Sequence, residues 1–340
     1  MDDTPDTTEP ADHDPAGRRP VDVVIVGGGA AGLSAALTLG RARRSVVVID
    51  AGEPRNAPAD HVHGYLTRDG VSPADLLALG REEVRGYGVE LVDGRAVRAT
   101  RAPEDGGTFA VELDNGRTVP GRRLLVTTGL VDELPDIPGL APRWGRDALH
   151  CPYCHGWEVR DQAIAVIATG AMGVHQASLF RQWSSDVTLL VHTGPAPTDE
   201  EREQFAARAV RIVEGTVAEV VVADDRITGV RLEGGPVVPA DAVVVQPRMV
   251  ARSDVLASLG IEAVEHPLGV GTLVEADPFG ATAVPGVWVA GNVVDMKLQV
   301  LPAAAAGATT AAVLNADLVA EDTARAVAAT KLAGAGAGRS

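Results

Sequence analysis

The chain contains two cysteines, and both lie in the hexapeptide Cys-Pro-Tyr-Cys-His-Gly at residues 151–156. Two cysteines separated by two residues can close and open a disulfide with little backbone movement, so the pair indicates two-electron thiol chemistry. His155 follows directly, and because an imidazole titrates near neutrality it could accept or supply the thiol proton; local packing of the ring is the alternative. We therefore predict Cys151, Cys154 and His155 as catalytic residues.

A glycine-rich turn near the start of the chain predicts a dinucleotide site. Gly27, Gly29 and Gly32 fit the pattern G-x-G-x-x-G directly after an apolar, β-branched segment and before an expected helix. In such a turn the backbone N–H groups can approach a pyrophosphate at the helix N-terminus. Asp50 ends the next expected strand, where an acid can bind ribose hydroxyls. The motif alone does not distinguish FAD from NAD.

The elements that position these residues form two strand–turn–helix units in succession. In the first unit we expect strands at 21–26, 45–49 and 124–126, a helix at 30–40, a helix start at Ser72–Asp75 and a hairpin at 109–119. In the second we expect strands at 163–168, 187–191 and 242–245, a helix to about Trp183 and a hairpin around 224–226. A strand at 287–290 and an Ala-rich helix at 302–320 follow. This order predicts an α/β fold with two Rossmann-like three-layer domains, the second inserted into the first.

Composition limits the classes of partner. With 340 residues the chain is long enough for two domains, and its net charge of −16 argues against nucleic acid. Residues 1–20 are acidic and Pro-rich without the features of a secretory signal, and we find no uninterrupted apolar run long enough to span a membrane. We therefore expect a cytoplasmic protein, in which the cysteine pair cycles rather than serving as a structural staple.

Other interpretations of the cysteines are weaker. The sequence Cys-x-x-Cys-His formally matches a c-type haem attachment site, which would require export. A zinc site would need a fourth ligand, and adjacent Cys154 and His155 are awkward for one tetrahedral metal. We therefore predict no metal.

From residue 21 to 318 the chain resembles the low-molecular-weight thioredoxin reductase family. The resemblance rests on the first glycine turn, Thr-Thr-Gly at 127–129, the C-x-x-C pair at the head of an inserted domain, and Val-Pro-Gly-Val-Trp-Val-Ala-Gly-Asn at 284–292. It implies FAD as the cofactor and a homodimer. The residues that it assigns to FAD, together with the glycine turn and Asp50, are Gly27, Gly29, Ala30, Ala31, Gly32, Asp50, Arg55, Asn56, Thr128, Gly129, Gly291, Asn292 and Gln299.

The resemblance also implies domain boundaries. Residues 21–140 and 249–320 would form the discontinuous FAD-binding domain, and residues 141–248 the inserted pyridine-nucleotide-type domain that carries the C-x-x-C pair. Residues 1–20 are expected to be a disordered tail, and residues 321–340 a flexible C-terminal tail. Within the FAD-binding part, Asn292 replaces the family's Asp and can still hydrogen-bond to the ribityl or phosphate region, while Leu298 stands where an Arg is expected beside Gln299.

The inserted domain departs from the family where NADPH would bind. The second glycine turn reads Ala-Thr-Gly-Ala-Met-Gly at 168–173, so its first glycine is lost. The next strand ends in Val-His-Thr-Gly at 191–194, without the two arginines that would clamp a 2′-phosphate. NADH, or a displaced arginine such as Arg181, could serve instead. We expect this domain to bind pyridine nucleotide poorly or not at all.

These departures favour one direction of electron flow. The heptapeptide at 151–157 resembles the dithiol oxidases that close the disulfide of holomycin- and gliotoxin-type metabolites with O2 as acceptor. By the resemblance, Cys154 faces the flavin and Cys151 exchanges with the substrate. The first hypothesis is therefore an FAD-dependent dithiol oxidase for a small-molecule dithiol. The alternatives are an NADPH-dependent thioredoxin-disulfide reductase with a thioredoxin-like partner, a ferredoxin-driven reductase, and a flavin redox sensor without turnover.

Five further residues near these motifs have two interpretations each. His61 and His63 follow a loop that in the family runs close to the flavin, but we favour solvated loop histidines. Trp144, Tyr153 and Trp157 could line a cleft for a small apolar dithiol, or pack at a domain interface.

Overall fold

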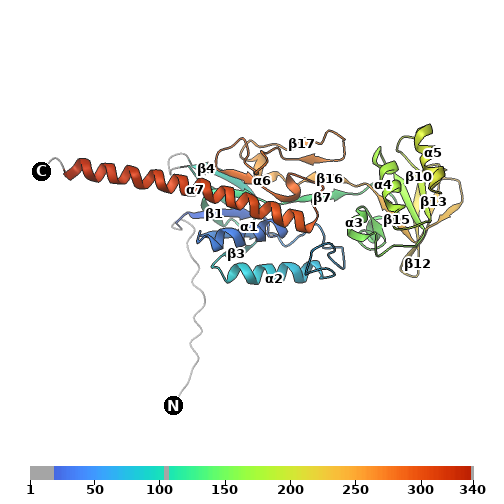
Figure 1. The fold of residues 1–340 in the computed structure, drawn as a ribbon, viewed down its shortest axis with the longest axis horizontal. Helices are drawn as coiled ribbons and strands as arrows, with labels where there is room; N and C mark the ends of the chain where they lie inside the picture. Colours follow the sequence, from blue (N-terminus) through green and yellow to red (C-terminus); the bar gives the residue numbers. More distant parts are fainter. Residues whose placement is uncertain (1–18, 103–106, 338–340) are drawn as a thin grey trace, which may run out of the picture.

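The computed structural model describes residues 19–102 and 107–337, with side chains as far as residue 333. The strands form two main sheets in two units that lie side by side (Figure 1). The tail predicted at residues 1–20 lies, apart from its last two residues, outside the described part of the chain.

The first unit is built on a seven-stranded sheet in the order β3-β2-β1-β6-β5-β4, with β19 beside β6. The strands β1, β2, β3, β6 and β19 run parallel to one another. The remaining strands are antiparallel: β5 pairs with β6 on one side and with β4 on the other. Buried Val, Ile and Leu side chains fill both faces, as the β-branched runs predict. The strands are β1 Val21–Val26, β2 Val46–Asp50, β3 Glu90–Asp93, β4 Ala96–Ala102, β5 Thr108–Leu113, β6 Thr118–Val126 and β19 Val287–Val289.

Among the described residues, four α-helices belong to the first unit. They are α1 Ala30–Arg41, α2 Pro73–Arg85, α6 Asp254–Ala257 and α7 Val300–Ala337. The predicted start of α2 is confirmed, because the Ser72 side chain accepts a hydrogen bond from Asp75 N–H and Pro73 occupies the first helical position. One prediction was incomplete: the second arm of the hairpin and the strand expected at 124–126 are the single strand β6.

The second unit repeats this arrangement on a five-stranded parallel sheet in the order β11-β10-β9-β15-β8. A three-stranded antiparallel sheet, β12-β13-β14, packs beside it. The strands are β8 Ala148–Leu149, β9 Ile164–Ala168, β10 Val187–Val191, β11 Arg211–Glu214, β12 Val217–Ala223, β13 Arg226–Leu232, β14 Val237–Pro239 and β15 Ala242–Val245. The α-helices are α3 Pro152–His155, α4 Met172–Phe180 and α5 Asp199–Ala207.

Two paired segments connect the units. The chain leaves the first unit through β7 (Leu130–Glu133) and returns through β16 (Arg248–Ala251), and these strands pair antiparallel (Figure 1). A small ladder of β17 (Val264–Glu265) and β18 (Thr272–Leu273) lies beyond the return. Because the two connections are neighbours, the head of the second unit, with its cysteines, faces the first glycine turn across a shared cavity.

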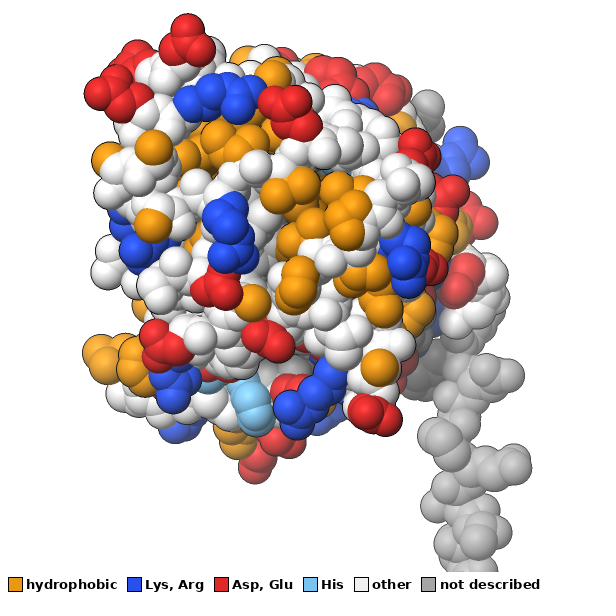
Figure 2. All heavy atoms as spheres, turned by 90° about the vertical axis from the view of Figure 1, so that its right-hand side faces the viewer, with side chains coloured by type: hydrophobic (Ala, Val, Ile, Leu, Met, Phe, Trp, Pro, Cys, Tyr) orange, Lys and Arg blue, Asp and Glu red, His pale blue; other side chains and the backbone are white. Residues whose placement is uncertain are grey.

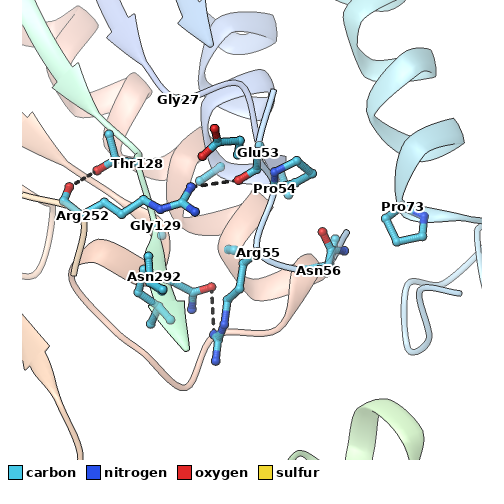
Figure 3. A pocket seen from close by; sticks show the side chains of 18 of the residues that line it. Gly27, Glu53, Pro54, Arg55, Asn56, Pro73, Thr128, Gly129, Arg252 and Asn292 are labelled. Carbon is cyan, nitrogen blue, oxygen red and sulfur yellow. Dashed lines mark hydrogen bonds between the residues drawn. The ribbon is translucent and has the colours of Figure 1, made fainter. Parts of the chain in front are cut away.

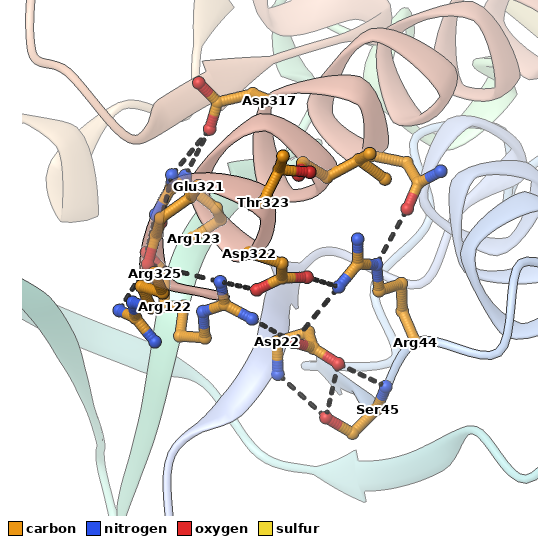
Figure 4. A network of polar contacts seen from close by, with 12 residues as sticks. Asp22, Arg44, Ser45, Arg122, Arg123, Asp317, Glu321, Asp322, Thr323 and Arg325 are labelled. Carbon is orange, nitrogen blue, oxygen red and sulfur yellow. Dashed lines mark hydrogen bonds and ion pairs between the residues drawn. The ribbon is translucent and has the colours of Figure 1, made fainter. Parts of the chain in front are cut away.

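Helix α7 corrects the predicted C-terminal tail. The helix does not end near residue 320 but continues to Ala337, extending beyond the rest of the first unit (Figure 1). The Ala-rich composition favours helix along its whole length, and Glu321 and Asp322 pair with arginines of the sheet (Figure 4). The flexible tail expected from residue 321 is therefore wrong as far as the described residues reach.

By length and composition α7 also passes as a membrane span, from Val300 to Ala333. The sequence analysis predicted no apolar segment long enough to span a membrane. In this fold, however, Ala311, Leu314 and Leu318 are completely buried in the core between α7, α1 and the first sheet. At Gly307 the two helices approach so closely that a Cβ would lie 2.0 Å from the carbonyl oxygen of Ala31. The first half of α7 is therefore a core helix of the first unit.

Candidate active site

One large cavity, of about 600 Å³, unites the predicted site residues. Its lining comes from the first glycine turn, the end of β2, the loop after it, the end of β6, the C-x-x-C segment and the segment before α7. Of the predicted residues only Gly32 is outside the lining. Gly32 instead lets α1 pack on the turn, since a Cβ there would lie 1.9 Å from the carbonyl oxygen of Gly27.

The first glycine turn fits a dinucleotide pyrophosphate. A Cβ at Gly29 would meet no heavy atom of the described residues within 4 Å, so the turn is open toward the cavity. Within the described chain, no side chain caps the N-terminus of α1 and no acidic residue lies in its first turn. The free N–H groups and the helix dipole are therefore available to a phosphate. The residues present fit FAD at this position.

Asp50 has a structural role that sequence reasoning did not foresee. One carboxylate oxygen accepts a hydrogen bond from Gly28 N–H at 3.0 Å, which fixes the turn. The other oxygen pairs with Arg81 of α2. Asp50 still lines the cavity where ribose hydroxyls were expected, and Arg81 now fixes its orientation.

Arg55 joins three segments at the centre of the cavity. Its guanidinium forms a bidentate pair with Asp132 of β7, with N–O distances of 2.7 and 2.8 Å. It also approaches the side-chain oxygen of Asn292 at 3.4 Å (Figure 3). The amide of Asn292 in turn donates to the carbonyl oxygens of Asp295 and Leu298. Asn292, expected to contact the cofactor directly, therefore mainly shapes its own loop and holds Arg55.

Arg252 is another site residue that the sequence did not reveal. It donates to the carbonyl oxygen of Glu53 at 2.8 Å, and its own carbonyl oxygen accepts a hydrogen bond from the Thr128 hydroxyl (Figure 3). These contacts fasten the end of β6 and the loop after β2 to the returning chain. Thr128 thus lines the cavity, but its hydroxyl is engaged with protein.

The cysteines are free thiols: Cys151 directly precedes the four-residue helix α3, and Cys154 lies within it. The Cys154 thiol donates a hydrogen bond to the Cys151 sulfur and lowers the pKa of Cys151 to about 6, against the opposing effect of burial. Backbone N–H groups of α3 and the Gln299 amide, 3.6 Å from the sulfur, stabilise the same thiolate. The pKa of Cys154 is raised by this hydrogen bond and by burial. Cys151 is therefore the thiolate of the reduced pair.

Two histidines flank the pair inside the cavity. Burial lowers the pKa of His155, and its Nε2 is buried without a hydrogen-bond partner in the described part of the chain. Burial also lowers the pKa of His150, whose Nε2 contacts Gln246 Oε1 at 2.9 Å. Both rings are therefore neutral near pH 7, and His155 keeps a nitrogen free to take a proton.

The aromatic residues near the cysteines divide between two hollows. Trp144 lines the large cavity, whereas Tyr153 and Trp157 line a second cleft on the outer side of α3. His63 lines both hollows, and its side chain is only 22% exposed. The solvated interpretation of this histidine is therefore wrong, while His61 is exposed as expected.

The second glycine turn is arranged differently from the first. The segment after β10 folds onto it, and the N–H groups of Thr193 and Gly194 both donate to the carbonyl oxygen of Ala168. His192 Nδ1 accepts from Val217 N–H. Arg181, considered as a displaced phosphate clamp, lies at the opposite end of α4 and donates to the Arg208 and Ser184 carbonyl oxygens. Neither His192, whose pKa is lowered by burial, nor Arg181 therefore offers a cation to a 2′-phosphate at this strand end.

Two Rossmann-like units, with a cavity that joins a glycine turn to a C-x-x-C pair, define a flavin-dependent disulfide oxidoreductase. Residues 21–309 match the family described as pyridine nucleotide-disulphide oxidoreductase, and the chain belongs to this family. Membership implies FAD as the cofactor and an enzyme that acts on thiols or disulfides.

Known relatives include proteins from fungi and bacteria. The chain is 33% identical over 281 residues to thioredoxin reductase tcpT of Claviceps purpurea, covering 80% of this chain and 86% of that one. It is 30% identical over 309 residues to thioredoxin reductase sirT of Leptosphaeria maculans, with coverage of 86% and 93%. The crystal structure of HlmI superposes with a TM-score of 0.86 at 48% identity, over 92% of this chain and 96% of that one. The crystal structure of an oxidoreductase from Agrobacterium tumefaciens superposes with a TM-score of 0.82 at 35% identity, over 88% of this chain and 99% of that one.

Proposed function

We propose that the protein is an FAD-dependent dithiol oxidase, which forms a disulfide in a small-molecule dithiol and passes the electrons to O2. The observation that carries the proposal is the second glycine turn, where the segment after β10 folds onto the turn and no arginine clamp is present. With its pyridine nucleotide site altered in this way, the enzyme would take its electrons from the thiol side.

The first unit would hold FAD. The glycine turn and the N-terminus of α1 would bind the pyrophosphate, Asp50 the ribose, and the segment around Gly291 and Gln299 the flavin end. The chemistry that bound FAD supplies there is acceptance of two electrons from the dithiol, with O2 as the final acceptor and H2O2 as the product. The protein's own residues carry out the thiol exchange.

In the proposed reaction Cys151 and Cys154 begin as a disulfide. A substrate thiolate attacks one sulfur of the pair, forming a mixed disulfide and releasing the other cysteine. The second substrate thiol then attacks the substrate sulfur of the mixed disulfide and expels the enzyme's sulfur. The low pKa of Cys151 makes it a good leaving group. The substrate loses two electrons and two protons, the cysteine pair gains the electrons, and His155 can take a proton at Nε2.

The anaerobic response of the flavin tests this direction. NADPH and a dithiol such as dithiothreitol are added separately to the purified protein, and the absorbance of the oxidised flavin near 450 nm is followed. We expect bleaching by the dithiol, with H2O2 on admission of air, and little bleaching by NADPH. Rapid bleaching by NADPH would reject the oxidase.

The second candidate is an NADPH-dependent thioredoxin-disulfide reductase, because tcpT and sirT both carry the name thioredoxin reductase. Turnover of NADPH with thioredoxin would establish it. A ferredoxin-driven reductase would need a docking face of one charge, and on the face of the second unit drawn in Figure 2 basic and acidic side chains are interspersed. A redox sensor would react once with excess dithiol under air and then stop, whereas the oxidase continues.

A further inference from the structure

The cleft on the outer side of α3 is distinct from the large cavity. It has a volume of about 510 Å³, within the usual range for small-molecule sites. Its lining consists of His63, Asp69, Pro152, Tyr153, Cys154, Trp157, Glu158 and Trp183. Only His63 and Cys154 of these residues also line the large cavity. The two hollows therefore meet at a histidine and one of the redox cysteines.

His63 is held firmly in this position. The preceding Val62 is buried and pairs with Val71, which closes the loop between them. Asp69, in the same loop, accepts a hydrogen bond from Gly64 N–H, and this contact lowers the pKa of its carboxyl group. The charged Asp69 carboxylate lies 3.4 Å from His63 Nδ1. Nδ1 is thereby favoured as the protonated nitrogen of the neutral ring, which leaves the lone pair on Nε2.

The other ring nitrogen is available for proton transfer. His63 Nε2 is buried and has no hydrogen-bond partner among the described residues. Glu158 Oε1 lies 3.3 Å away, at ion-pair distance but without hydrogen-bond geometry. The ring therefore lies between two carboxylates, with Asp69 at Nδ1 and Glu158 at Nε2. His61, with its ring centroid 6.0 Å away, and His155 are the other titratable groups that face the ring.

The walls of the cleft are aromatic. Tyr153 packs edge-on against Trp183 with the ring centroids 5.6 Å apart, and Trp157 carries the Arg160 guanidinium 4.2 Å from its ring centroid. Tyr153 and Trp157 are nevertheless 63% and 65% exposed. Large aromatic side chains left in water beside a reactive centre indicate a surface that a ligand covers. The carboxylates of Asp69 and Glu158 add acceptors for N–H donors at the rim.

We propose that this outer cleft binds the substrate dithiol, which is a compact molecule with a flat apolar face and N–H donors, and that His63 accepts the proton of its attacking thiol. The inference rests on the proposed dithiol oxidase function and adds the substrate class and the base. The thiol gives its proton to Nε2, and the thiolate attacks Cys154, the sulfur of the disulfide that lines the cleft, so that the S–S bond breaks and Cys151 leaves as a thiolate. The second substrate thiol then loses its proton and attacks the substrate sulfur of the mixed disulfide, which forms the substrate disulfide and expels Cys154.

The His63→Gln variant tests the base. The rate constant for anaerobic flavin bleaching by excess dithiothreitol is measured from pH 6 to 10, with His175→Gln on the exposed face of α4 as the control. We expect H63Q to be slower by about 100-fold at pH 7, the usual contribution of a general base. The deficit should shrink above pH 9, because the substrate thiol then ionises without help. An equal loss at every pH, or no loss, would overturn the role of His63.

The Trp157→Ala variant tests the apolar wall, with Trp157→Phe as the conservative variant and the exposed Phe279→Ala as the control. The probes are dithiothreitol and the flat aromatic dithiol 1,2-benzenedimethanethiol. We expect W157A to raise KM for the aromatic dithiol by about tenfold, with partial rescue in W157F and little change for dithiothreitol. Unchanged KM values for both probes would remove the cleft as the substrate site.

Failure of the inference can be separated from failure of the proposed function. If neither dithiol bleaches the wild-type flavin, the oxidase is rejected whatever the variants do. If the wild type turns over and the variants match it, only the outer cleft is rejected. If W157A leaves both small dithiols unchanged and slows only the oxidation of reduced thioredoxin, the cleft is a protein-docking surface and the small-molecule proposal is overturned.

Discussion

The two glycine turns occupy equivalent places in two sheets of equivalent strand order, β3-β2-β1-β6 and β11-β10-β9-β15. In the first, Gly28 N–H donates to the Asp50 carboxylate and Gly29 leaves open space above the turn. In the second, the backbone after β10 donates to the Ala168 carbonyl oxygen. The same topology thus gives one turn that is held by an acidic side chain and one whose Ala168 carbonyl is held by the backbone after β10, while Gly29 and Gly170 both leave open space above their turns. The chemistry of the second unit lies at its head, where the cysteines are.

The largest effect should come from replacing the cysteines, which carry the thiol chemistry of the second unit and are not part of the glycine turn of the first. We expect Cys151→Ser and Cys154→Ser each to lower dithiol turnover by more than about 1000-fold, because the disulfide can no longer form. Flavin content, measured by absorbance after purification, should remain at the wild-type level. Residual turnover within tenfold of wild type would mean that electrons reach the flavin without the pair.

A matched pair of substitutions tests the difference between the turns directly. A Cβ at Gly29 or at Gly170 would meet no heavy atom within 4 Å in the described chain, so a larger side chain fits at both positions. Gly29→Asp places a carboxylate where a pyrophosphate would bind, and we expect flavin affinity to fall by about 100-fold or more. Gly170→Asp should leave flavin affinity unchanged. Equal loss in both variants, measured by flavin titration of the apoprotein, would contradict the comparison.

The sequence predicted the parts of the site that depend on local patterns. Buried β-branched strands, the first glycine turn and the C-x-x-C pair all lie where their spacing indicated, and one cavity joins them. The polar contacts that hold the cavity together were not predicted. Arg55 and Asp132 are 77 residues apart, and Arg252 and Glu53 are 199 apart. Such pairs depend on how the units fold together, and no local period marks them.

His63 and α7 show two other limits. A histidine in a polar loop normally faces water, and only the inserted unit, through Glu158, turns His63 into a lining residue. The prediction of a flexible tail from residue 321 was wrong because the Ala-rich segment has a high helix propensity. Glu321 and Asp322 also attach this part of the helix to arginines of the first unit (Figure 4).

Smaller effects are expected from one largely enclosed arginine in each unit. Arg122 pairs with Asp22, Glu321 and Asp322, and Arg143 pairs with Asp147 and Asp225; their side chains are 15% and 5% exposed. Replacement of either by Ala should destabilise its own unit modestly, because the half-buried carboxylates around it lose their donor, whereas the exposed Asp225 and Asp322 remain hydrated.

The two units offer separate signals for this test. Flavin release reports the first unit, and tryptophan fluorescence mainly the second, since Trp144, Trp157 and Trp183 lie between β7 and β16 while Trp288 lies in β19. In urea, Arg122→Ala should shift chiefly the flavin transition and Arg143→Ala chiefly the tryptophan transition. If both variants shift both signals equally, the units unfold as one.

The smallest effect should come from Gln299, through which the first unit touches the cysteines of the second. Its amide lies 3.6 Å from the Cys151 sulfur and helps to lower the pKa of Cys151 to about 6. A lowered pKa means that thiolate predominates above about pH 6, so alkylation of the reduced protein by iodoacetamide should be near its maximum at pH 7. Gln299→Ala should move the midpoint up by at most about one pH unit, while Gln204→Ala on α5 should not move it. An unchanged midpoint in Gln299→Ala would show that the two units do not cooperate in activating the thiol.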